Sequence, residues 1–170
     1  MYCPNCGAPL HLTADQDSFP CEYCRSVYVP EENEDGVRVL EETSPLPCPV
    51  CAVPLVQAAL ADRQVLYCKQ CRGLLVSMHI FPGLLDELRA RRDGHPRVQS
   101  PLDRKAFDRR LACPQCRQRL DTHTYDGPGN VVIDSCSHCD LNWLDYGEMS
   151  RIVRAPDHHY AEEDAYGRTG

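Results

Sequence analysis

Twelve cysteines in 170 residues, all arranged in C-x2-C pairs, predict a small metal-stabilised α+β fold built from three four-cysteine units. Two further observations support this prediction. The spacing between consecutive pairs recurs along the chain, and the residues around the cysteines repeat as well. No cysteine is left outside a pair, so the cysteines are expected to organise the whole fold.

The pairs group in chain order into three sets. The two pairs of a set are separated by 14 residues (7–20), 16 residues (52–67) and 19 residues (117–135), which is near the spacing of zinc ribbons. Two thiolates separated by two residues can face one ion from a tight turn, and two such turns complete a tetrahedral shell. The predicted ligand sets are Cys3, Cys6, Cys21 and Cys24; Cys48, Cys51, Cys68 and Cys71; and Cys113, Cys116, Cys136 and Cys139.

Metal binding competes with disulfide formation as an explanation of so many cysteines. The chain begins Met-Tyr-Cys-Pro-Asn-Cys, so a cysteine pair occupies the place of a signal peptide, and the longest apolar runs are too short to span a bilayer. We therefore expect a cytoplasmic protein with no membrane contact, in which the thiols bind metal. Iron and zinc both accept four thiolates, but the ribbon-length spacing favours zinc, at three ions per chain.

The units also match outside their cysteines. Proline follows each first cysteine, and leucine lies four residues after each second one (Leu10, Leu55 and Leu120). Four residues after each last cysteine comes an apolar residue, Tyr28, Leu75 or Trp143, which we expect to cover the metal site.

Each unit is predicted to be a β-hairpin with zinc knuckles, and the second and third units to be followed by a short helix. Residues 64–67 and 131–134 are β-branched or aromatic enough to form strands, and residues 126–129 supply a turn. Residues 82–92 carry a leucine stripe, with Gly94 as the expected stop. After Trp143, Asp145 is expected to cap a helix that has Glu148 three residues later.

These elements suggest six segments. They are a first ribbon (1–30), an acidic linker (31–46), a second ribbon with its helix (47–93), a basic linker (94–108), a third ribbon with its helix (109–154) and a tail (155–170) expected to be disordered. The arrangement expected is one of beads on a string rather than one large core.

The pattern C-P-x-C-x3-L followed by C-x2-C-x3-W-L-D-x-G-E resembles the transcription-factor-IIB-type zinc-ribbon family of small bacterial proteins. The third unit matches best, and the second is a divergent copy with Leu75-Val76-Ser77 in place of W-L-D. The first unit resembles a generic zinc ribbon. The resemblance implies zinc ligation and the ribbon fold, and it brings no established activity with it.

The formal net charge of −7 disfavours nonspecific binding to nucleic acid, and twelve thiolates with three zinc ions would bring it to about −13. A basic stretch at 89–119 nevertheless keeps a nucleic-acid-binding regulator as an alternative. Its candidate contacts are Arg89, Arg91, Arg92, Arg104, Lys105, Arg109 and Arg110.

The sequence does not predict an enzyme. Four cysteines fill every position around an ion, whereas catalytic zinc keeps one position open, and no hydrolase or nucleotide-binding motif occurs. We expect a noncatalytic adaptor or regulator that binds a protein partner, with an iron-based redox protein as a second alternative. The expected partner contacts are Trp143, Tyr146, Leu84, Leu85 and Leu88.

Overall fold

The computed structural model describes residues 1–13, 16, 18–92 and 100–156. The first ribbon contains β1 (Phe19–Pro20) and β2 (Val27–Tyr28). The second contains β3 (Val37–Pro47), β4 (Pro54–Leu60), β5 (Arg63–Tyr67), β6 (Leu74–Ser77) and α1 (Phe81–Arg91). A 3-10 turn, η1 (Arg104–Asp108), precedes the third, which contains β7 (Asp121–Thr124), β8 (Val132–Cys136), β9 (Leu141–Leu144) and α2 (Glu148–Arg154).

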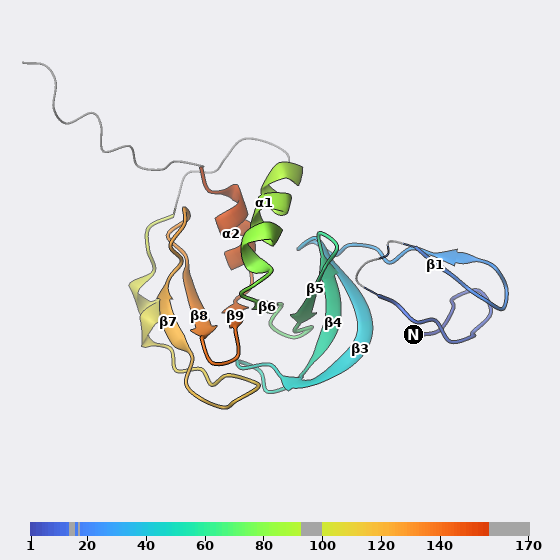
Figure 1. Cartoon of the computed structure of the whole chain (residues 1–170), viewed down its shortest axis with the longest axis horizontal. Helices are drawn as coiled ribbons and strands as arrows, with labels where there is room; N and C mark the ends of the chain where they lie inside the picture. Colours follow the sequence, from blue (N-terminus) through green and yellow to red (C-terminus); the bar gives the residue numbers. More distant parts are fainter. Residues whose placement is uncertain (14–15, 17, 93–99, 157–170) are drawn as a thin grey trace, which may run out of the picture.

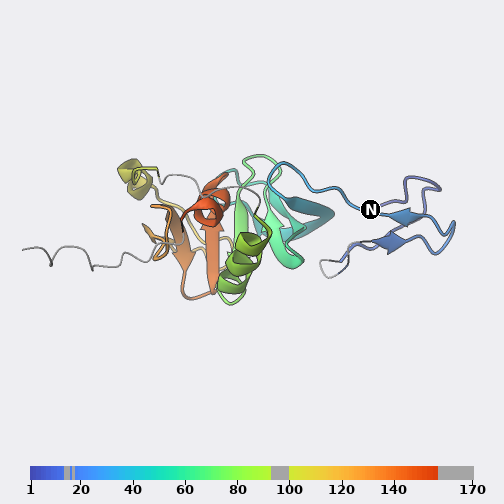
Figure 2. The ribbon, with the colours of Figure 1, turned by 90° about the horizontal axis from the view of Figure 1, so that it is seen from above.

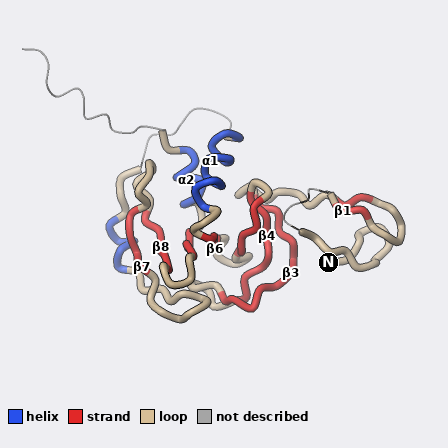
Figure 3. Tube along the Cα trace, viewed as in Figure 1, coloured by secondary structure: helices blue, strands red, loops and turns tan. Residues whose placement is uncertain are grey.

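The second and third ribbons share one antiparallel sheet of seven strands, in the order β3-β4-β5-β6-β9-β8-β7. The strands are drawn in red in Figure 3. The join is the β6–β9 pair, in which Leu75 lies opposite Trp143. These two residues occupy equivalent positions, four after the last cysteine of their ribbons. The unit β4-β5-β6-α1 is therefore related to β7-β8-β9-α2 by an approximate twofold axis through this pair.

One face of this sheet is covered by α1 and α2, which lie side by side (Figure 1). Their apolar residues, including Leu84 and Ile152, form one buried cluster with Val76 and Leu144 of the two joined strands. The end of α2 is also held by α1, because Arg92 donates to the Val153 and Ala155 carbonyls at 2.9 and 3.1 Å. Arginine at these carbonyls complements the negative end of the helix dipole.

The expectation of separate beads is wrong for the second and third ribbons. A single hairpin is too small to bury the apolar face of its own strands. Pairing β6 with β9 buries the apolar faces of the two hairpins at once. The first ribbon does lie apart, at one end of the molecule (Figure 2).

Residues 37–46 are not a linker, as the sequence suggested, but most of the edge strand β3. Val37 is fully buried and Leu40 is 5% exposed, and acidic neighbours in the sequence obscured this apolar pattern. Leu40 belongs to the apolar cluster of the first ribbon. The buried Arg38 also joins the two parts, since it donates to the Gln16 carbonyl at 3.3 Å and pairs with Asp62 at 2.6 Å.

The predicted strands at 64–67 and 131–134 are confirmed within a residue or two by β5 and β8, and both predicted helices are present. The predicted stop of the first helix, Gly94, lies outside the described residues, as do most of the tail and part of the basic linker. The predicted cap of the second helix is wrong. Gly147 is the N-cap with φ of 82°, and the Asp145 N–H instead donates to the Glu148 carboxylate at 2.7 Å.

Gly73 provides a test of the joined sheet. A Cβ at this position would lie 2.2 Å from Cζ2 of Trp143, so Gly73→Ala is expected to destabilise the unit by about 1–3 kcal/mol. Thermal unfolding of the zinc-loaded chain measures this. Gly83→Ala in α1 is the matched control, because a Cβ there meets nothing within 4 Å, and it should leave the melting temperature unchanged or slightly raised. Equal effects of the two substitutions would contradict the close approach of Trp143.

Candidate metal centres

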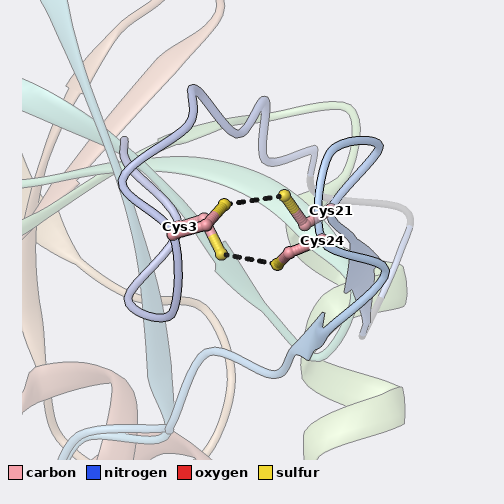
Figure 4. A group of neighbouring side chains, drawn as sticks. Cys3, Cys21 and Cys24 are labelled. Carbon is pink, nitrogen blue, oxygen red and sulfur yellow. Dashed lines mark hydrogen bonds between the residues drawn. The ribbon is translucent and has the colours of Figure 1, made fainter.

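The twelve cysteines form three groups, each with all four sulfur atoms within 4.8 Å of one another. These are the three sets that the spacing predicted. In the first ribbon the sulfurs of Cys3, Cys21 and Cys24 point toward one another from two facing loops (Figure 4). The carboxylates and histidines of the described residues contribute to none of the three groups.

The sulfur separations fit a tetrahedral zinc ion. The Sγ atoms lie 3.7 Å apart for Cys3 and Cys24, and 3.6 Å apart for the pairs Cys6–Cys21, Cys48–Cys71 and Cys116–Cys136. Zinc–sulfur bonds of about 2.3 Å require tetrahedral edges of about 3.8 Å, whereas a disulfide requires about 2.05 Å. The donor set and its geometry therefore fit three zinc ions, and each ion would have a closed shell.

Each knuckle is shaped by a backbone turn. In five of the six pairs the N–H that follows the second cysteine donates back to the carbonyl of the first, as in Gly7 to Cys3 (2.8 Å) and Ala52 to Cys48 (2.9 Å). In the last pair the Cys139 N–H donates to the Cys136 carbonyl at 3.3 Å. The residue that closes the turn has a left-handed backbone, with φ of 73° at Gly7, 59° at Ala52 and 62° at Arg72. Only the first knuckle uses glycine there, so the sequence did not reveal this repeated strain.

The predicted covering residues pack as expected in the joined ribbons. Leu75 and Trp143 are at most 3% exposed, and they share a single apolar cluster with the repeated leucines Leu55 and Leu120 and with cysteines of both metal sites. The first ribbon has its own smaller cluster, and its covering residue Tyr28 is only half-buried. Two of the three sites are thus shielded jointly and the third separately.

A polar network explains the W-L-D-x-G-E motif of the third ribbon. The Trp143 indole N–H donates to Asp145 at 3.0 Å. The Asp145 carboxylate also accepts hydrogen bonds from both terminal guanidinium nitrogens of Arg109. Arg109 lies 3.5 Å from the buried Asp134, and Glu148 accepts from the Asp145 N–H. The motif residues therefore anchor the tryptophan on the twofold axis. The second ribbon, with Leu75 in place of tryptophan, has Ser77 where this anchor would be.

Ionisation of the thiols is uneven. Burial raises the pKa of Cys48 to about 11, whereas the Gln118 N–H lowers the pKa of Cys116 to about 7 and the Ser26 hydroxyl lowers that of Cys24 to about 5. Because zinc binds the thiolates, binding releases protons from the less acidic thiols. Zinc affinity must then fall as the pH falls.

Three of the expected partner contacts are buried and are therefore not accessible to a partner. Trp143 and Leu84 are fully buried and Leu85 is 2% exposed, because they form the cores that hold the joined sheet together. Tyr146 is 56% exposed. It lines one groove together with the half-buried Leu88, so these two residues remain accessible.

The basic candidates do not form one patch. Arg89 and Arg92 hold carbonyls of α2, Arg91 pairs with Asp62 and Glu87, and Arg109 belongs to the tryptophan network. Arg110 donates to backbone carbonyls, and Arg104 and Lys105 are exposed on η1.

Sequence reasoning missed Arg72 as a link between the ribbons. Its guanidinium lies 4.2 Å from the centroid of the Tyr146 ring and donates to Asp35 at 2.8 Å. It joins the knuckle that ends at Cys71 to the turn before β3 and to the third ribbon. Arg72 directly follows Cys71, but nothing in the sequence indicates which distant residues it contacts.

Comparison with known proteins agrees with this geometry. Residues 112–155 match the model of a family described as transcription factor zinc-finger, of the transcription-factor-IIB zinc-ribbon type. The third ribbon is a transcription-factor-IIB-type zinc ribbon. No curated protein and no solved structure matches the chain. Among the described residues, the helices are too short or too polar to cross a membrane.

The shared cluster predicts that the transcription-factor-IIB-type ribbon and the second ribbon hold their zinc cooperatively. The wild-type chain should carry three zinc ions and no colour. Cys139→Ser removes one ligand of the third site and should also speed zinc loss from the second site about tenfold. Native mass spectrometry during chelator competition measures both effects.

Cys24→Ser, at the equivalent position of the first ribbon, is the control. Since the first ribbon has a separate cluster, this variant should lose one zinc and release the other two at the wild-type rate. If Cys139→Ser also loses one zinc alone, the two sites are independent.

Glu148 gives a pH-dependent prediction. Burial raises its pKa to about 7, helped by Asp134 and opposed by Arg109 and Arg151. The folded state therefore binds this proton more tightly than the unfolded state, so the contribution is present at low pH and lost as the pH rises. Glu148→Gln should gain about 1 kcal/mol relative to wild type between about pH 6 and about pH 8. Denaturant unfolding of zinc-loaded protein measures the difference, and a pH-independent difference would contradict it.

Proposed function

We propose that this protein is a noncatalytic zinc-binding adaptor or regulator that acts in the cytoplasm through protein–protein contacts, in association with transcription. The observation that carries the proposal is the closed shell of each metal site. Four cysteines converge at every site, so no coordination position is left for water or a substrate. Zinc then serves to fix the fold, and the surface of the fold serves the function.

The arrangement of the ribbons supports an adaptor. Two ribbons are joined into one sheet by the β6–β9 pair, and the first ribbon projects beyond it (Figure 2). A rigid two-ribbon body with a third, separately folded ribbon presents two surfaces to partners. Support for the association with transcription comes from the family match of the third ribbon alone.

The groove beside Tyr146 is the contact surface that we propose. Its lining includes the buried apolar residues Leu60, Leu74 and Met149 and the exposed Tyr146. The lining also carries charges of both signs, including Glu34, Asp35, Arg91 and Arg154. Charges of both signs around apolar side chains favour a protein segment with an apolar centre and mixed charge over a nucleic acid.

The two alternatives predict different behaviour. A nucleic-acid-binding regulator requires affinity that falls steeply with salt and depends on the exposed Arg104 and Lys105. An iron protein requires colour and a reducible metal. Binding that survives nuclease treatment and moderate salt, by a colourless zinc-loaded chain, supports the adaptor over both.

Tyr146→Ala tests the groove. Tyrosine is enriched among the residues that contribute most to binding at interfaces, so recovery of the bound partner from cell extract should fall about tenfold. Quantitative affinity purification in moderate salt measures the recovery. Tyr23→Ala is the control, because Tyr23 is 73% exposed on the first ribbon, away from the groove. Loss of binding with Tyr23→Ala alone would place the contact on the first ribbon instead.

A further inference from the structure

Cys6 differs from the other eleven cysteines. It is the one exposed cysteine, and the second cysteine in each of the other five pairs is only partly exposed. All twelve cysteines lie within the described residues, so the comparison covers the complete set.

The packing around the three sites explains this difference. In the joined ribbons even the partly exposed cysteines, Cys51, Cys71, Cys116 and Cys139, pack against the shared cluster beneath Leu75 and Trp143. In the first ribbon Cys24 packs against the smaller cluster, but Cys6 does not belong to it. Solvent therefore reaches the first site from the side of Cys6.

Hydrogen bonding distinguishes Cys6 within its own site. The Ser26 hydroxyl lies 2.9 Å from the sulfur of Cys24 and 3.4 Å from that of Cys3, and the Asn5 amide donates to Cys24 at 3.5 Å. Such contacts withdraw charge from a thiolate and lower its reactivity. Among the described residues, no hydroxyl or side-chain amide makes a hydrogen bond to Cys6, and the sulfur of Cys21 lies 3.6 Å from the Cys6 sulfur.

We propose that Cys6 is an oxidation site for hydrogen peroxide, and that its oxidation releases the metal of the first ribbon alone. The Cys6 thiolate attacks one peroxide oxygen, the O–O bond breaks, and sulfenic acid forms while the leaving hydroxide takes a proton to become water. The Cys21 thiolate then attacks the Cys6 sulfur and displaces hydroxide, which becomes a second water. The two sulfurs lose two electrons in forming the disulfide, and the peroxide gains them.

The consequence is confined to one part of the molecule. Disulfide formation removes two of the four zinc ligands, and a ribbon of this size depends on its ion to fold. The first ribbon has its own cluster and meets the sheet through Leu40 and Arg38. The seven-stranded sheet therefore keeps its two zinc ions. This inference depends on zinc in the first site and is independent of the adaptor proposal.

The test uses the full zinc-loaded chain and hydrogen peroxide. Zinc release is followed with a chromogenic chelator, and the oxidised cysteines are located by alkylation and peptide mass spectrometry. One zinc per chain should be released about tenfold faster than the other two, with a Cys6–Cys21 disulfide formed in that phase. Release of all three ions in one phase, or an early phase in which Cys6 stays reduced, would overturn the proposal.

Cys6→His provides a variant that keeps a zinc ligand, because three cysteines and one histidine also form a structural zinc site. It should abolish the fast phase, and Cys51→His at the equivalent position of the second ribbon should leave the fast phase unchanged. Fast release from zinc-loaded Cys6→His would overturn the proposal. If Cys6→His holds no zinc, the wild-type chain decides the question. Alkylation at successive times of peroxide treatment shows the order in which the cysteines are oxidised, and oxidation of any other cysteine before Cys6 would overturn the proposal.

Discussion

The pairing of β6 with β9 is the interaction on which most of this structure depends. It places Leu75 opposite Trp143, brings two metal sites to one apolar cluster, and brings α1 and α2 together over the other face of the sheet. Neither half has enough apolar surface to achieve this alone, since small domains bury too little on folding. The join therefore converts two zinc-dependent hairpins into one body with a true core.

Zinc contributes differently to the stability of the two parts of the molecule. In the first ribbon the metal shell is the main source of stability, because the apolar cluster around Leu10 and Phe19 is small and Cys6 faces solvent. In the joined ribbons the same shell is embedded in packing that also serves the neighbouring site. Identical ligand sets thus differ in accessibility because of what surrounds them, rather than because of the ligands themselves.

The metal ligands and ribbon hairpins were predictable because a zinc shell imposes a local spacing that the sequence displays directly. The strand β3 was not, because its apolar residues Val37 and Leu40 lie among acidic neighbours and are buried by different partners. The β6–β9 join was also hidden, since nothing local specifies which strand covers Leu75. For this reason the sequence wrongly indicates Trp143 and Leu84 as partner-contact residues. Their exposure depends on a pairing between residues far apart in the sequence.

The divergence of the second ribbon follows from the same join. Two tryptophans on the twofold axis would compete for one space, and Trp143 already approaches so closely that position 73 tolerates no side chain without rearrangement. A smaller residue at 75 and glycine at 73 make room for it, while Asp145, itself bound by Arg109, accepts a hydrogen bond from the indole N–H. The two copies have therefore become complementary halves. This complementarity favours pairing within one chain over pairing between identical ribbons of two chains, because two third ribbons would bring two tryptophans together.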